Sequence, residues 1–233
     1  MKVKCIWEHN GQDSLIYCQD FIGAFTRGPS REIAIAKIQN EINGYLKWRG
    51  EDKDCVIEIE IIQEKESNLQ ICDADSDVLF DSEREPLTMD EYLQLKNLAL
   101  KSAKDFLALY ISIPDKNTCL STYRKTFYGQ IPQTASEIYE HTKKVNAYYF
   151  AEIGVIADND GDIYECRKRA FEKLESSSNF LENTVFVGSY GEEWTVRKVI
   201  RRFIWHDRIH AKSMYRRARK LYGAEIIENK FFF

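Results

Sequence analysis

Hydrophobic and polar residues alternate along much of the first seventy positions. The alternation in residues 2–8 and 14–18, with Asn10-Gly11 between them, predicts a hairpin closed by a glycine-containing turn. A third run, residues 55–63, alternates Val and Ile with Glu and predicts a half-exposed strand. Since an isolated hairpin is marginal in water, the pair needs more sheet to be stable.

Between the hairpin and the last strand, the apolar spacing changes to that of a helix. Ser30 is the predicted N-cap, because its hydroxyl can accept a hydrogen bond from the first helical turn. The apolar positions that follow recur at roughly helical steps: Ile33, Ile35, Ile38, Ile42 and Leu46. Residues 1–70 are therefore predicted to form a small β-α-β domain.

Residues 73–85 hold a cluster of acidic side chains, and Pro86 follows directly. Charge repulsion and proline both oppose a packed element. We expect residues 71–87 to be an acidic linker at a domain boundary, outside the core.

The remainder of the chain, residues 88–233, has the patterning of four helices. Three segments resemble capping boxes, in which a Ser or Thr and an acid three residues later satisfy each other's N–H groups: 88–91, 134–137 and 189–192. The predicted helices span about 88–111, 134–154, 164–176 and 192–222, the last ending at a glycine. Four helices of this length predict a bundle, and the fold class is α+β.

Composition places the chain among folded proteins, with 44% hydrophobic residues, a net charge of -4 and a pI near 5.7. No apolar run has the length of a membrane span or of a signal-peptide core, so we expect a cytoplasmic protein without a membrane partner. The six cysteines contain no CxxC pair, which disfavours a zinc knuckle.

A basic run between residues 197 and 220 raises nucleic-acid binding as a class. Cations near a helix C-terminus are favoured by the helix dipole, and no second basic, aromatic-rich surface accompanies them. A solvated helix face is the preferred interpretation, and a nucleic-acid partner is not expected.

The chemistry is concentrated in three of the four histidines. His206 and His210, in WHDRIH, lie one helical turn apart on an apolar stripe with Val199 and Phe203. In the second predicted helix, His141 lies on the corresponding inward stripe. Three inward imidazoles could hold Zn, Ni or Fe and leave positions open for water or substrate. Neutral histidines hydrogen-bonded without a metal are the alternative.

The segment FIGAFTRGPSREIAIAKI, together with the hairpin and the late strand, resembles the HicB-like antitoxin fold over about residues 1–65. The resemblance implies a protein-binding domain and carries over no site residue.

The helical half, about residues 87–223, resembles the DinB/YfiT-like metalloenzyme superfamily. The resemblance rests on the helix order, on His141 in ASEIYEHTKKVNAYYFAE, and on His206 and His210 in WTVRKVIRRFIWHDRIHAKSM. It implies a three-histidine divalent metal site, a homodimer, and transfer of a small thiol to an electrophilic substrate. The extra N-terminal domain departs from the family and leaves the substrate open.

Two hypotheses of function follow. The first is a metal-dependent enzyme, a thiol S-transferase or a hydrolase, in which His141, His206 and His210 are the ligands. The second is a non-enzymatic module in which the HicB-like domain recognises a protein partner and the bundle is a scaffold, since no acid/base pair is evident.

Four other features were weighed. Asp207 is expected at the surface or beside the ligands rather than as a base. The acidic segment 158–162 lacks the glycine of a calcium loop and is expected to be a turn. His9 is expected to be an exposed hairpin residue. The aromatic segment 121–132 could line the mouth of the site or pack in the core.

Overall fold

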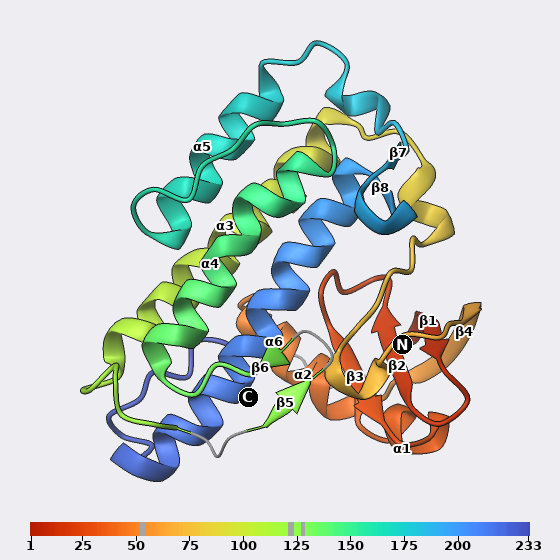
Figure 1. Cartoon of the computed structure of the whole chain (residues 1–233). Helices are drawn as coiled ribbons and strands as arrows, with labels where there is room; N and C mark the ends of the chain where they lie inside the picture. The colour runs from red at the N-terminus through yellow and green to blue at the C-terminus, as the bar shows by residue number, and fades with distance from the viewer. Residues whose placement is uncertain (52–54, 121–123, 127–128) are drawn as a thin grey trace.

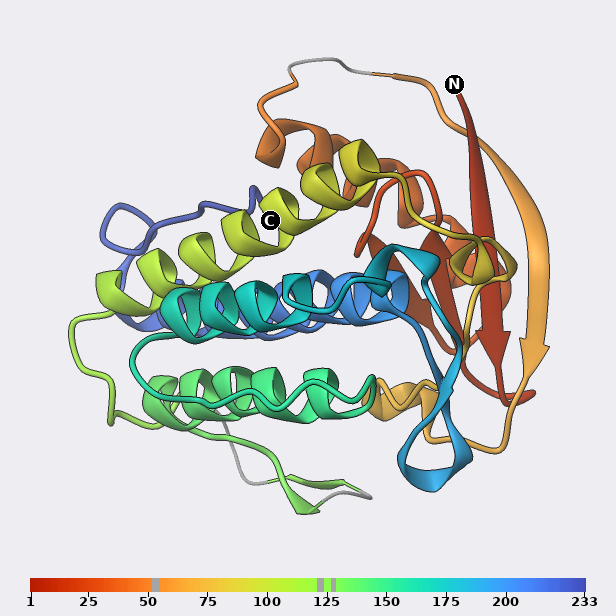
Figure 2. The same ribbon diagram turned by 90° about the horizontal axis from the view of Figure 1, so that it is seen from above.

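The computed structural model describes residues 1–51, 55–120, 124–126 and 129–233. A small N-terminal sheet stands beside four long helices that run side by side (Figures 1 and 2). The predicted α+β class is confirmed. The finer assignments, a HicB-like sheet and a DinB-like bundle, stay predictions.

The N-terminal sheet has the strand order β3-β2-β1-β4. Its strands are β1 (Lys2–His9), β2 (Ser14–Cys18), β3 (Phe25–Gly28) and β4 (Glu58–Glu66). Neighbouring strands are antiparallel except β1 and β4, which are parallel and pair Val3 with Ile59. The predicted hairpin is confirmed, whereas the last strand begins three residues later than the alternation suggested.

The turn of the hairpin follows from its sequence. The Asn10 side-chain oxygen accepts hydrogen bonds from the backbone N–H groups of Gln12 and Asp13, at 3.1 and 2.8 Å. Gly11 adopts a φ of 83°, which glycine reaches without a Cβ penalty. The Asn-Gly pair therefore closes the turn as predicted.

The predicted helix after Ser30 is divided into α1 (Arg31–Ile35) and α2 (Ile38–Trp48). Ser30 caps α1 by accepting from Ile33 N. In a continuous helix, the Ala34 carbonyl would accept from the N–H four residues on. Here it accepts from Thr26 Oγ1 at 2.8 Å and from Lys37 N at 3.2 Å. The prediction of one continuous helix was wrong, because the Thr26 hydroxyl of β3 competes for the Ala34 carbonyl.

The four long helices are α3 (Met89–Ser112), α4 (Ala135–Ala151), α5 (Ile163–Glu175) and α6 (Val196–Tyr222). Thr88 and Thr134 cap α3 and α4 in complete capping boxes, with Glu91 and Glu137 closing them as predicted. The third predicted helix, 164–176, corresponds to α5.

The predicted box at residues 189–192 is wrong. Thr195 caps α6 by accepting from Lys198 N at 3.1 Å. Ser189 instead opens a 3-10 turn between two short strands that pair with each other, β7 (Phe186–Val187) and β8 (Glu193–Trp194). The remaining short elements are η1 (Ile71–Asp73), η2 (Asp81–Arg84), β5 (Lys125–Thr126), β6 (Gly129–Gln130), η3 (Phe180–Glu182) and η4 (Ser189–Gly191).

The segment predicted as an acidic linker is packed against the sheet and α6. Val78, Phe80 and Leu87 are buried, and the first two share an apolar cluster with Tyr17 of β2 and Trp205 of α6. The expectation that charge and Pro86 keep residues 71–87 out of the core is therefore wrong. The buried apolar residues outweigh the acids, which point to partners or solvent. The division into domains at this segment stays a prediction.

Helix α6 joins the two halves. It packs against α3 and α4 on one side, and its Ile204 and Trp205 meet the N-terminal half on another. Gly23 permits this approach, because a Cβ at that position would lie 2.5 Å from Ile204 Cγ2. The larger apolar cluster is likewise shared, and Trp48 of α2 donates from Nε1 to Asp105 of α3 at 2.7 Å.

Among the described residues, no helix combines the length and the hydropathy needed to cross a bilayer.

Candidate metal centre

The three candidate ligands come from two helices, α4 and α6, each of which begins at a threonine N-cap. His141 lies in the second turn of α4, after the Thr134 capping box, and His206 and His210 lie in the middle of α6. Residues four apart on a helix share a face. Both α6 histidines therefore project toward α4, as the apolar stripe predicted.

The structure brings the three rings together. His141, His206 and His210 each offer a ring nitrogen, and these atoms all lie within 4.8 Å of one another. The Nε2 atoms of His206 and His210 are 3.2 Å apart, and His141 lies with its ring centroid 5.2 and 4.7 Å from theirs. In the described part of the chain, these three form the only grouping of three potential metal-ligating side chains.

The spacing of the α6 pair suits a common cation. Two nitrogens bound tetrahedrally to zinc at 2.0–2.1 Å are separated by about 3.3 Å, close to the 3.2 Å observed. The same spacing also suits a hydrogen bond between one protonated and one unprotonated ring nitrogen, which is the metal-free alternative.

Burial makes the histidines neutral bases. It lowers the pKa of His141, and the charge of Lys144 lowers it further. For His206 and His210 burial again is the main cause, joined by the other histidines and by nearby arginines, and their pKa values fall well below the ordinary value. Neutral imidazole is the form that binds a metal, so the protonation state fits a ligand set.

One nitrogen of the cluster lacks a partner. His206 is 8% exposed, and its Nδ1 atom is buried without a hydrogen-bond partner among the described residues. Buried polar atoms usually have partners, and an exception often marks a functional site or an absent ion or water. The three neutral nitrogens that lie within 4.8 Å of one another fit a divalent transition metal. The Nδ1 atom of His206 is on the other side of its ring from Nε2, so it cannot bind the same ion, and among the residues that the structure describes it lacks the acceptor that usually orients a ligating histidine.

Of the two positions predicted for Asp207, the surface is excluded, and the position beside the ligands stays a prediction. It is fully buried rather than at the surface, and its two carboxylate oxygens accept from Arg167 Nη1 and Nη2 at 2.6 and 3.0 Å. Arg167 also lies over the ring of Phe203, 4.3 Å from its centroid. A carboxylate held in this bidentate pair is not available to act as a base.

Part of the basic run of α6 is buried rather than on a solvated face, whereas Arg216, Arg219 and Lys220 are exposed as predicted. Lys198, Arg201 and Arg208 are all at most 1% exposed. Arg201 donates to the two carboxylate oxygens of Glu83 at 2.5 and 3.0 Å, and Arg208 donates to Glu41 at 2.6 Å. A run of cations in a chain of net charge -4 was the available signal that acidic partners lie elsewhere in the fold.

The acidic segment, His9 and part of the aromatic segment lie among the described residues. Asp158 receives hydrogen bonds from Arg169, and Asp162 caps α5, so segment 158–162 is the expected interhelix turn. His9 is partly buried rather than exposed; it contacts Glu64 at 3.1 Å and stacks on Trp7. In the aromatic segment 121–132, residues 121–123 and 127–128 lie outside the described residues, so both interpretations stay open. No disulfide bond joins the six cysteines, all of which lie among the described residues.

No protein-family model matches the chain, and no curated protein or solved structure is significantly similar to it.

Proposed function

We propose that His141, His206 and His210 hold one divalent metal ion, zinc, nickel or iron, and that the protein is a metal-dependent enzyme. The observation that carries the proposal is the convergence of three neutral ring nitrogens within 4.8 Å from two helices. The resemblance of the helical half to DinB-like metalloenzymes supports the same assignment.

A divalent ion with three neutral ligands keeps its positive charge and favours deprotonation of a water or a thiol near neutral pH. The chain's residues supply the surroundings. The ring of buried Tyr149 lies beside the cluster, edge-on to His206, with the two ring centroids 6.2 Å apart. Transfer of a small thiol to an electrophile is the first candidate reaction, and hydrolysis is the second.

The metal is tested on protein purified without a histidine tag. We expect about one divalent ion per chain by elemental mass spectrometry, and loss of most of it in His206→Ala. His9→Ala is the matched control, because it removes the fourth histidine, which pairs with Glu64 far from the cluster in the sheet. The proposed metal site is refuted if the parent protein holds no stoichiometric metal or if the His206→Ala variant retains it.

The reaction is tested separately on metal-loaded protein. We expect consumption of a small thiol in the presence of 1-chloro-2,4-dinitrobenzene, or release of nitrophenol from a nitrophenyl ester, above the rate with His206→Ala. Equal rates for parent and variant with both reagents refute the enzymatic role and leave the metal result standing.

The second candidate is a protein-binding module in the N-terminal half. Strand β4 lies at the edge of the sheet, where a partner strand could add, and Ile62 on it is 43% exposed. A homodimer formed through this edge is one version of the proposal. Sedimentation of the full chain and of Ile62→Lys tests that version: a dimer that persists in the variant excludes this edge.

A further inference from the structure

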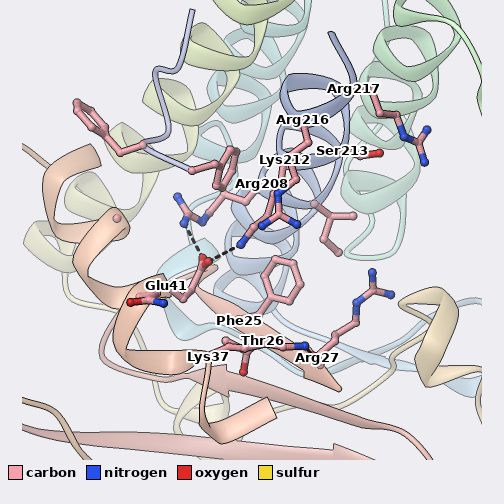
Figure 3. A pocket seen from close by; sticks show the side chains of 15 residues that line it. Phe25, Thr26, Arg27, Lys37, Glu41, Arg208, Lys212, Ser213, Arg216 and Arg217 are labelled. Atoms are coloured by element: carbon pink, nitrogen blue, oxygen red, sulfur yellow. Dashed lines mark hydrogen bonds and ion pairs between the residues drawn. The ribbon is translucent and has the colours of Figure 1, made fainter. Parts of the chain in front are cut away.

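A cavity of about 650 Å³ lies where the two halves meet. It is lined by residues of β3, α2 and the second half of α6, and by the chain's last two residues, Phe232 and Phe233 (Figure 3). Its volume is within the range typical of small-molecule sites, about 300–1,000 Å³. Gly44 lets the C-terminal segment close one side, because a Cβ there would lie 2.7 Å from the Phe232 oxygen.

The wall of this cavity is strongly positive. Its lining includes six cationic side chains and one acid, Glu41; the cations are Arg27, Lys37, Arg208, Lys212, Arg216 and Arg217. This concentration stands in a chain whose net charge is -4. Cavities lined by one sign of charge attract ligands of the opposite sign, because low-dielectric walls focus the field.

Glu41 does not balance this charge. Its carboxylate already accepts from Arg208 at 2.6 Å and from Lys212 at 3.0 Å (Figure 3). Lys37 donates to a neutral group, the Arg27 carbonyl, at 2.6 Å. An excess of positive charge therefore faces the cavity even after the internal ion pairs are formed.

A buried arginine with unused donors contributes to the same wall. Arg208 is 1% exposed, and its Nε and Nη1 atoms make no hydrogen bond within the described residues. Rings of Tyr45 and Phe233 hold its guanidinium at 5.0 and 5.2 Å from their centroids. Unsatisfied buried donors of a charged group are costly. Both atoms are closed off from solvent, so they add positive potential to the wall without contacting an occupant directly.

Apolar residues complete the lining. Phe25, Ile209 and Phe233 face the cavity beside the cations, so an occupant with an apolar part as well as charge is accommodated. Two of the lining cations, Arg27 and Arg217, lie near enough to His210 for their charges to help lower its pKa, so the cavity wall and the histidine cluster are close together.

We propose that this cavity binds a small organic anion that carries two or more carboxylate or phosphate groups, with Arg216 and Arg217 among its contacts. The cavity's charge does not depend on a metal. The additional step, that the anion is a substrate of the neighbouring centre, rests on the proposed function.

The test uses the full chain after removal of metal, so that its outcome is independent of the metal centre. Citrate probes carboxylates and inorganic pyrophosphate probes phosphates, each titrated calorimetrically at about 0.05 M salt, where screening is weak. We expect at least one probe to bind, and the double substitution Arg216→Gln with Arg217→Gln to weaken binding about tenfold or more, because charge-assisted hydrogen bonds are lost.

Arg219→Gln is the matched control. Combined with Lys220→Gln, it removes an equal charge, two cations, from exposed positions of the same helix that do not line the cavity, and we expect less than about a twofold change, as for exposed charges. Arg216→Glu is the second variant; Arg216 is exposed, so reversal of its charge leaves the core intact, and it should abolish binding of the same probe.

Preference between citrate and pyrophosphate identifies the anionic group, and either preference supports the proposal. Absence of binding of both probes at millimolar concentration overturns it, as does a cavity double variant that weakens binding no more than Arg219→Gln combined with Lys220→Gln. Tight binding of a single-stranded oligonucleotide, with neither small probe bound, also overturns it in favour of nucleic acid. Metal content measured on the same samples shows separately whether the histidine centre holds.

Discussion

Two sides of α6 carry buried polar groups that differ in one respect, whether a group of opposite charge pairs with them. On the side toward the N-terminal half, Arg201 and Arg208 are bound by Glu83 and Glu41. On the side toward α4, His206 and His210 meet His141, and no carboxylate joins the cluster within the described residues.

This difference assigns different roles to the two sides of α6. A buried cation requires a counter-charge, and the two glutamates satisfy that requirement and fix where the halves meet. Buried imidazoles can be neutral, so they need no counter-charge, and their lone pairs remain available to a cation. The arginine side is therefore a junction, and the histidine side is a candidate site.

The largest loss of stability is expected when one partner of a buried ion pair is removed and the other stays charged. Asp207→Ala leaves Arg167 buried and uncompensated, and we expect the free energy of unfolding to fall by about 3–5 kcal/mol. Urea denaturation followed by circular dichroism measures it. The double variant Arg167→Met with Asp207→Leu removes both charges and should recover most of the loss; a double variant as unstable as Asp207→Ala would contradict this explanation.

The next effect concerns the approach of the N-terminal half to α6. Gly23→Ala places a Cβ 2.5 Å from Ile204 Cγ2 at a φ of 85°, and we expect a loss of about 1–3 kcal/mol from overpacking and backbone strain. Gly11→Ala is the control, because Gly11 has a φ of 83° and nothing within 4 Å of the added Cβ. Equal losses in the two variants would mean that the close contact with α6 contributes nothing.

The pH dependence of stability tests the protonation state of the histidines. The folded protein keeps its three histidines neutral below the pH at which they protonate in the unfolded chain, near 6.5. The unfolded state then binds more protons, so the stability of metal-free protein falls as pH falls through 6.5. We expect a smaller slope for His206→Gln, by about 1 kcal/mol per pH unit. Urea midpoints between pH 7.5 and 5 measure it; identical slopes contradict the neutral state of His206.

On the arginine side, the stability contributed by Glu41 depends on pH in a lower, acidic range. Burial alone would raise the pKa of Glu41, but Arg208 and Lys212 outweigh it and hold the pKa below the ordinary value. Its contribution to stability is present above the unfolded value of 4.5 and is lost as pH falls through the folded value. Glu41→Gln should lack this acid-dependent loss, whereas the decline that begins near 6.5 should remain.

The smallest effect is expected for an exposed ion pair. Arg84 and Glu193 are paired at 2.5 Å, yet each side chain is 44% exposed. We expect Arg84→Gln to cost about 0.5 kcal/mol, because solvent screens both charges. The cost should vanish in about 0.5 M salt. A loss as large as that of Asp207→Ala would remove the distinction between buried and exposed pairs.

Local signals in the sequence predicted much of the fold. The Asn10-Gly11 turn, the Ser30 cap and the Thr88 and Thr134 boxes all lie within a few residues of the groups they bond. The apolar stripe of α6 also predicted that His206 and His210 face inward. Each of these depends on interactions between near neighbours, which a single sequence displays directly.

The errors came from partners far away in the chain. Thr26 divides the predicted helix by taking the Ala34 carbonyl, and the sequence shows no sign of that competition. Arg201 and Arg208 are buried because they pair with Glu83 and Glu41, which lie 118 and 167 positions earlier in the chain. From sequence alone, an unpaired surface cation and a buried paired one look the same.

The sequence by itself therefore determined the four long helices, the hairpin and the three histidines that could share a site. Only the tertiary structure decided that those histidines meet, that the basic residues of α6 are divided between buried ion pairs and the wall of a cavity, and that the acidic segment before Pro86 is packed. The physical reason is that turns, caps and helical faces are set by neighbouring residues, whereas burial and charge pairing are set by the whole chain.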